Sequence, residues 1–263
     1  DLRINDNQAL IKAFSLSNAI TSTYILDKNY SNDFNANSRA WFLGNSLKEL
    51  GNNWAKLGSR LVIGEGDPVL IIPQLAKSIN AKFVVWNKSI EPYEISRDLK
   101  IKNYLKEIKI QYIESWDHLL VEPSEIFSGN NKPYSVYGPF YKNLKSKMDL
   151  LGVYEDDQSI FKFNDVENEF KDKQEIKSSD SILKKFLKNS KFSGSTICPC
   201  RPGEKDAEIL LKTFINEKKI YSYKAARDLP SYKGTSFLSA SLRFGTISIR
   251  KVWNATLNLG FEN

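Results

Sequence analysis

The chain has 263 residues, of which 41% are hydrophobic and 26% are charged, and its formal net charge is +7 at pH 7. The length allows one large domain or two ordinary ones, and the apolar content excludes an intrinsically disordered chain. No apolar run is long enough to cross a bilayer and no signal peptide is visible, so we expect no membrane partner, while the basic charge suits an anionic one.

The first quarter of the chain predicts a helix, a strand and a longer helix. Asp6 can cap a helix that runs to about residue 18, and residues 20–26 are β-branched and aromatic, as in a strand that ends at Asp27. Ser38 can cap an amphipathic helix that runs to about residue 57 and is closed by Gly58. Apolar residues of this helix recur near helical spacing and are expected in the core. They are Trp41, Phe42, Leu47, Leu50 and Trp54.

The alternation of strand and helix continues to about residue 115. Residues 60–63 predict a strand, and the glycines after it lead into a helix with Asp67 as N-cap and Pro68 as first residue. No nucleotide fingerprint is complete in this turn, which favours a plain connection over a phosphate-binding loop. Strands over 83–86 and 111–115 flank a helix over about 92–108. This order is typical of an α/β fold with a doubly wound parallel sheet.

The second half of the chain has a different character. Residues 150–200 are rich in Lys, Asp, Glu and Ser, which indicates a connector with some short helices. From Glu204 the pattern is helical, with Ala207, Leu211 and Phe214 on one face. We therefore expect an α/β domain over residues 1–125, a connector over 126–200 and the beginning of a helical domain over 201–263.

A hydroxyl-rich turn near the end of the chain is the strongest candidate site. Tyr223 and Arg227 precede it, and a helical pattern follows it. Small hydroxyl side chains and free amides at the start of a helix can bind an anion. The turn could therefore surround the phosphates of a nucleotide cofactor, and the alternative is a capped helix with polar surface residues. Its hydroxyl residues are Thr235, Ser236, Ser239 and Ser241.

A second candidate site lies at the edge of the predicted sheet. Ligands of open parallel sheets bind beyond the carboxyl ends of the strands, where Asp27 and the segment 87–91 fall. Arg39, in the first turn of the long helix, can reach the same edge. The alternative is a salt bridge between Glu91 and Arg39 that only holds the loops. Apolar walls would come from Ile25, Leu26, Phe42 and Ile90.

The cysteines and the single histidine offer little further chemistry. Cys198 and Cys200 are too close in sequence for an unstrained disulfide and too few for a zinc site, so we interpret them as structural. An intracellular, cytoplasmic location fits this use of cysteine. His118 is expected to pack or to lie on the surface. A lone histidine argues against hydrolytic triads and multi-histidine metal sites, and we expect no metal.

Four segments resemble the DNA photolyase and cryptochrome family, in the family's order and at about its spacing. The likeness is nearest to microbial class I photolyases for cyclobutane pyrimidine dimers, especially cyanobacterial ones, and residues 150–200 show no specific match. The resemblance implies a Rossmann-like α/β domain, a connector and the start of an all-α FAD-binding domain. The matching segments are residues 1–10, 86–93, 131–140 and 223–242.

The resemblance also implies that this chain is an N-terminal fragment. In the family one more strand precedes the first matching segment, and the chain starts at Asp1 without a Met. We therefore expect the first, central strand to be missing, together with most of the helical domain. Such a fragment should be poorly stable and should not repair DNA alone.

The function implied is that of a deoxyribodipyrimidine photo-lyase, in which reduced FAD donates a photoexcited electron to a pyrimidine dimer in damaged DNA. An antenna chromophore would harvest additional light, and the protein would act as a monomer. This chemistry needs no triad, metal or general base, so no catalytic side chain is assigned. A cryptochrome photoreceptor is the alternative, and a nucleotide-binding α/β protein is a third reading that lacks a glycine-rich phosphate loop.

The resemblance assigns site residues by position. Arg227 aligns with an arginine that contacts DNA, the alternative being a surface pair with Asp228. Tyr93 replaces the asparagine of the folate-binding type, which favours 8-hydroxy-5-deazaflavin over methenyltetrahydrofolate as the antenna. The positions aligned with FAD contacts are Tyr223, Thr235, Ser236, Phe237, Leu238, Ser239, Ala240, Ser241 and Leu242. Those aligned with antenna contacts are Ile25, Leu26, Asp27, Arg39, Ser89, Ile90, Glu91, Pro92, Tyr93, Glu94 and Arg97.

Overall fold

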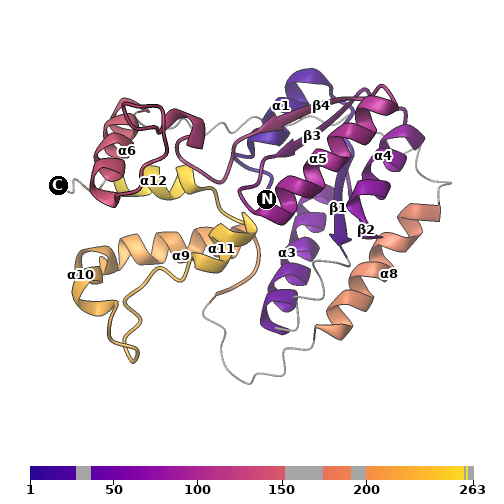
Figure 1. Cartoon of the computed structure of the whole chain (residues 1–263). Helices are drawn as coiled ribbons and strands as arrows, with labels where there is room; N and C mark the ends of the chain where they lie inside the picture. The colour runs from indigo at the N-terminus through magenta and orange to yellow at the C-terminus, as the bar shows by residue number, and fades with distance from the viewer. Residues whose placement is uncertain (28–36, 152–173, 191–199, 258, 260–263) are drawn as a thin grey trace.

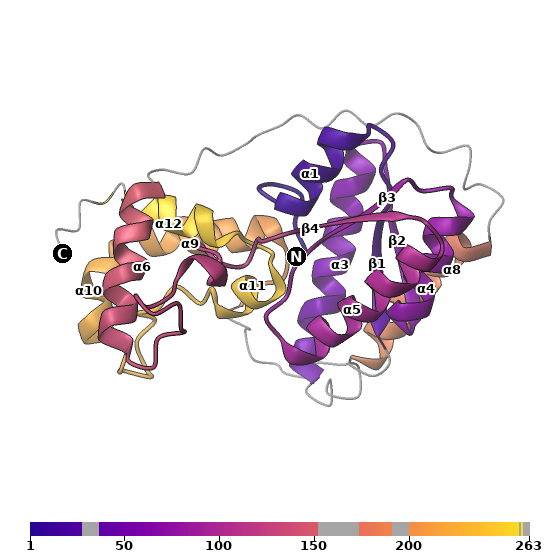
Figure 2. The same cartoon turned by 45° about the horizontal axis from the view of Figure 1, so that its top comes forward.

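The computed structural model describes residues 1–27, 37–151, 174–190, 200–257 and 259. Figure 1 shows two groups of elements side by side, an α/β group and a group of helices. The N-terminus lies at the junction between them in both views (Figure 2). This placement makes the first residues of the chain part of the boundary between the groups.

The α/β group contains two parallel strand pairs. β1 (Ser22–Asp27) pairs with β2 (Leu61–Gly66), and β3 (Phe83–Asn87) pairs with β4 (Gln111–Ser115). Parallel neighbours need a crossover, and α3 (Asn37–Lys56) and α5 (Pro92–Glu107) provide one for each pair. α4 (Pro68–Ser78) connects β2 to β3. The predicted α/β fold with parallel strands is confirmed.

The described strands form two two-stranded sheets, with no ladder between the pairs. The strand expected to precede residue 1 stays a prediction.

The helix caps were predicted with mixed success. Asp67 caps α4 as expected, accepting a hydrogen bond from Val69 N at 2.9 Å. The predicted cap at Asp6 is wrong, because Asn7 caps α1 (Gln8–Leu16), with its Oδ1 3.3 Å from Leu10 N.

The α/β group has one core cluster between α3 and the pair β1–β2 and a second where α4 and α5 pack on the pair β3–β4. Leu47 and Trp54 on α3 pack in the first cluster with Ile63 of β2, as the helical spacing predicted. α8 (Gln174–Asn189) covers the neighbouring edge of β2: Ser179 Oγ accepts a bond from Ile63 N at 3.0 Å and donates one to Ile63 O at 3.3 Å. A helix over an edge strand satisfies backbone groups that would otherwise be available for pairing.

The second group consists of helices with a smaller core. It contains α9 (Glu204–Asn216), α10 (Lys219–Ala226), α11 (Ser239–Phe244) and α12 (Ile249–Leu257). Both views place α6 (Tyr137–Leu151) with this group, after a short 3-10 helix, η2 (Pro123–Glu125). The three predicted segments and the two boundaries between them stay predictions. No described helix is long and apolar enough to span a membrane. The core residues are Ala207, Leu211, Leu238 and Ile247.

Candidate functional site

The hydroxyl-rich turn joins α10 to α11 and is anchored at its start. Gly234 is buried against Ala226, and a Cβ at position 234 would collide with the Ala226 side chain. Ala226 is three residues after Tyr223, about one helical turn along α10. Glycine at position 234 therefore lets the turn begin close to the helix that carries Tyr223.

The turn presents hydroxyl groups that solvent can reach. Thr235 and Ser236 are half-buried and Ser239 is exposed, while Tyr223 is 42% exposed. The backbone bends sharply at Phe237, whose φ is 55°. Leu238, the residue before α11, makes no side-chain capping bond to that helix. These features leave the turn chemically suited to an anionic group.

Two predicted flavin contacts lie away from the accessible face. Leu238 is 3% exposed and packs with Ala207 and Ile247 in the helical core. Ser241 is fully buried, and its Oγ has no hydrogen-bond partner among the described residues. Ala240 and Leu242 are half-buried, so they can still border the turn. The accessible part of the predicted set is therefore the turn itself with Tyr223.

Arg227 lies at the end of α10, beside Tyr223. Its Nε is 3.7 Å from Asp228 Oδ2, and its guanidinium is 5.9 Å from the centre of the Tyr223 ring. The predicted alternative, a surface pair with Asp228, is thus present. Both side chains are more than half exposed, and such pairs contribute only about 0–1 kcal/mol. Arg227 therefore remains available to an external phosphate.

At the sheet edge, the end of β1 meets the start of α5. Tyr93 Oη donates to Asp27 Oδ2 at 2.7 Å, which brings two predicted antenna residues together. Ser89 Oγ accepts from Glu91 N at 3.1 Å and shapes the loop before the helix. Ile90 is 54% exposed at this rim. The carboxyl end of β1 thus contacts the first turn of α5, the helix that follows β3.

Other predicted antenna residues have protein partners or lie elsewhere. Glu91 pairs with Arg243 of α11 at 2.9 Å, so the alternative of a salt bridge between Glu91 and Arg39 is not seen among the described residues. Arg39 is exposed and has no ion pair among the described residues. Arg97 pairs with Asp98 at 2.7 Å; burial raises the pKa of Asp98, and the arginine offsets only part of this.

The remaining members of the antenna set differ in exposure. Leu26 and the wall residue Phe42 are buried in the α/β core, and Ile25 is half-buried. Pro92 is exposed and Glu94 is half-buried in the first turn of α5. A ligand at this rim would therefore meet the loop and helix start, while Leu26 supports the strand from inside.

A buried ionic cluster at the junction was not predicted from the sequence. Asp117, just after β4, accepts from Arg3 Nη2 at 2.5 Å and from Arg250 Nη2 at 2.8 Å. Arg250 Nε also donates to Asp6 Oδ1 at 2.9 Å. These four residues come from three distant parts of the chain, which is why local patterns gave no signal. The hydrophilic character of Asp117 and Arg250 instead suggests surface positions.

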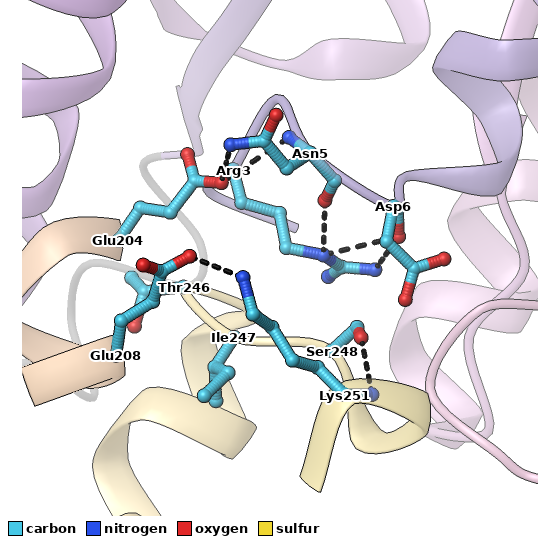
Figure 3. A pocket seen from close by; sticks show the side chains of 9 residues that line it. All are labelled: Arg3, Asn5, Asp6, Glu204, Glu208, Thr246, Ile247, Ser248 and Lys251. Carbon is cyan, nitrogen blue, oxygen red and sulfur yellow. Dashed lines mark hydrogen bonds and ion pairs between the residues drawn. The ribbon is translucent and has the colours of Figure 1, made fainter. Parts of the chain in front are cut away.

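Figure 3 shows a polar pocket beside this cluster, between the first residues of the chain and the helices α9 and α12. Its charged side chains already have partners in the protein. Glu204 accepts from Asn5 Nδ2 at 2.6 Å, and Lys251 pairs with Glu208. Burial raises the pKa of Glu204. The pocket is therefore part of the packing between the two groups.

The cysteine and histidine side chains are placed as follows. Cys200 is half-buried and its Sγ donates to Phe237 O at 3.4 Å, and Cys198 lies outside the described residues. His118 Nε2 is 3.1 Å from Asp1 Oδ1, and burial lowers the pKa of His118 to about 4. Within the described ranges, no group of three or more His, Cys, Asp or Glu side chains could hold a metal ion.

Comparison with known proteins identifies the relatives of this arrangement. The sequence model of the DNA photolyase family matches residues 1–159. A deoxyribodipyrimidine photo-lyase from a Synechococcus strain is 34% identical over 258 residues, covering 97% of this chain and 51% of the relative. Cryptochrome-1 of Rattus norvegicus is 27% identical, covering 95% of this chain and 43% of that protein.

The fold also has a counterpart among solved structures. An archaeal photolyase from Sulfolobus tokodaii, solved with two FAD molecules, superposes with a TM-score of 0.76 at 24% identity. The alignment covers all of this chain and 54% of the archaeal one. This chain thus spans about half the length of these relatives.

Proposed function

Because the chain belongs to the DNA photolyase family, we propose that its full-length protein is a deoxyribodipyrimidine photo-lyase that repairs cyclobutane pyrimidine dimers in DNA. The observation that carries this proposal is the accessible hydroxyl turn anchored beside Tyr223 by Gly234. The photo-lyase relative is more similar to this chain than the cryptochrome, which favours repair over light signalling.

The residues of the turn fit a phosphate-bearing cofactor such as FAD. Thr235, Ser236 and Ser239 offer hydroxyl donors, and before α11 the Leu238 amide donates a long bond of 3.4 Å to Ser236 Oγ, which leaves the Ser236 hydroxyl proton available. Tyr223 would border the cofactor from α10. When bound and reduced, FAD supplies the photoexcited electron that splits the cyclobutane ring. The protein binds and orients it, and no side chain here needs to move a proton.

Arg227 would contact DNA next to this site. Its planar guanidinium can pair with two phosphate oxygens, and its exposure leaves it free to do so. A pyrimidine dimer must leave the base stack to reach a cofactor held by the protein. Contacts of this kind give affinity that depends on salt and little on sequence. We further propose that the protein acts as a monomer on damaged DNA.

The sheet edge would hold the antenna chromophore, and we propose 8-hydroxy-5-deazaflavin in preference to methenyltetrahydrofolate. The bond between Tyr93 and Asp27 supports this choice. Tyr93 occupies the position of the asparagine in folate-binding sites, and its hydroxyl is already bonded to Asp27. Exposed Ile90 would contribute an apolar contact at the rim. The absorption spectrum of the purified full-length protein distinguishes the two antennas, and a colourless protein would reject both.

FAD binding to variants of the full-length protein tests the flavin site. The double substitution T235V and S236A should weaken FAD binding about tenfold or more, since hydrogen bonds to a charged group contribute about 1.5–3 kcal/mol. S222A is the matched control, because Ser222 lies on α10 beside Tyr223 and donates only to Lys219 O. Equal FAD affinity in all three proteins would contradict the assignment.

A further inference from the structure

The buried ionic cluster connects the α/β group to the residues that directly follow the hydroxyl turn. Arg250, at the start of α12, donates to Asp6 and Asp117 and also to the Asp117 carbonyl at 3.0 Å. Arg3 donates to Asp117 and, through Nη1, to Gly245 O at 3.2 Å. The α/β group and the N-terminal loop therefore hold residues 245–250 from two sides.

The cluster is shielded from water. The side chains of Arg3, Asp117 and Arg250 are 3%, 1% and 8% exposed. Taking such charges out of water is costly unless each one is paired and hydrogen-bonded. Here each guanidinium donates several bonds, and Asp117 also accepts from Gln8 N at 3.1 Å. All of these hydrogen bonds can form together in only one geometry, so the cluster fixes how the α/β group and the helical group pack against each other.

Packing contacts beside the cluster also fix the position of α11. Leu2 N donates to Phe244 O at 3.0 Å, and Phe244 stacks on Phe42 of α3 with ring centres 5.2 Å apart. Gly245 adopts φ 65° directly against Asp1, where a Cβ would collide with that residue. The last residues of α11 are thus fixed to both α3 and the N-terminal loop, one short helix away from the turn.

We propose that Arg3, Asp117 and Arg250 are positioning residues for the flavin site: they hold the end of α11 and thereby the hydroxyl turn in its binding geometry. This inference rests on the proposed function. None of the three residues is on the accessible turn, and they act through Gly245 and the start of α12. The flavin site of the helical group therefore depends on the loop at the start of the chain.

The test compares variants of the full-length protein. R250M removes the charge and the bonds to Asp6 and Asp117, while R250K keeps the charge and loses the planar fork. E114Q is the control, because the pair Lys102–Glu114, at 3.1 Å, is partly buried but joins α5 to β4 within the α/β group. For each protein we would measure FAD affinity, and hydrogen exchange without FAD in peptides covering residues 239–250 and 92–115.

The proposal predicts that R250M accelerates exchange in residues 239–250 and weakens FAD binding about tenfold, with unchanged exchange in residues 92–115. R250K should be intermediate, and E114Q should match the wild type. A folded R250M that binds FAD as tightly as the wild type overturns the proposal, as does a uniform rise in exchange over both peptides. If R250M does not fold, R250K carries the same comparison.

The two ideas fail in different ways. A wild-type protein that binds no FAD rejects the proposed function. The exchange comparison in the FAD-free proteins then still decides whether the cluster holds α11, the helix that directly follows the turn, because it needs no cofactor. Faster exchange confined to residues 239–250 supports the positioning role, and unchanged exchange there rejects it.

Discussion

At the scale of single residues, exposure separates side chains that can meet a ligand from those that organise the protein. Arg227 is 52% exposed, and its guanidinium makes a long contact with Asp228 and lies 5.9 Å from the Tyr223 ring. Asp117 is 1% exposed and accepts bonds from two arginines and a backbone amide. The first residue can therefore serve DNA binding, whereas the second can act only within the fold.

Substitution of Arg227 should weaken DNA binding by about the same factor for every DNA sequence. The R227M variant of the full-length protein loses one phosphate contact, so the slope of log affinity against log salt should fall by about one. Binding of dimer-containing and undamaged duplexes at several salt concentrations checks this. Lys233→Met, on the exposed loop that leads into the hydroxyl turn, is the comparison. An unchanged salt slope for R227M would mean that Arg227 does not touch DNA.

Because of Asp117, the free energy of unfolding should depend on pH in the acid range. Burial alone would raise the pKa of Asp117, but Arg3 and Arg250 together outweigh it and hold the pKa below the ordinary value of 3.8. Because the carboxyl pKa is lower in the folded protein, charged Asp117 stabilises the fold fully above pH 3.8. This stabilisation is lost as the pH falls through the pKa of the folded state.

The D117N variant removes this titration. It should be about 3–5 kcal/mol less stable at pH 7, because two arginines are left with an uncharged buried partner. Its free energy of unfolding should also change less between pH 5 and pH 3 than that of the wild type. Denaturant unfolding across this range is the measurement. Parallel curves for the two proteins would show that Asp117 is not the group that titrates.

At the scale of helices and strands, local sequence patterns were sufficient where a local cause sets the structure. The strand over 111–115 and the helix that begins at Pro68 were placed correctly, because alternation and an Asp–Pro start are local signals. The cap at Asp6 was misplaced because its carboxylate binds Arg250, which is 244 residues away. No window of sequence contains both partners.

The packing of α8 over the edge of β2 is a second feature that the sequence did not predict. Residues 150–200 were interpreted as a connector, yet Ile182, Leu183 and Phe186 pack against the α/β core. The charged residues of α8 mask this apolar face in the composition. The bonds between Ser179 and both backbone groups of Ile63 show how the helix substitutes for a neighbouring strand.

Removal of the Ser179 hydroxyl should therefore destabilise the α/β group. The S179A variant leaves the buried N–H and C=O groups of Ile63 without this partner, at a cost of about 1–3 kcal/mol in the free energy of unfolding. S78A is the control, because Ser78 is exposed and its hydroxyl donates to Leu75 O within its own helix. If S179A were no less stable than S78A, the edge of β2 would not depend on α8.

At the scale of the whole molecule, the α/β group and the helical group meet at the first residues of the chain. The sequence pointed to two candidate sites, the sheet edge through the strand ends and the turn through its hydroxyl residues, and both sites stay predictions. It could not show that Glu91 of one site pairs with Arg243 beside the other, since 152 residues separate them. Pairings over such distances depend on how the two groups pack.

Light-driven repair by the full-length protein tests the central claim most directly. Oligonucleotides that carry a cyclobutane pyrimidine dimer would be incubated with the flavin-reduced protein, in blue light and in darkness. The account predicts loss of dimers in light only, with a wavelength dependence that follows the bound chromophores. Bound, reduced flavin with no light-dependent loss of dimers would contradict the account and would favour a photoreceptor of the cryptochrome type.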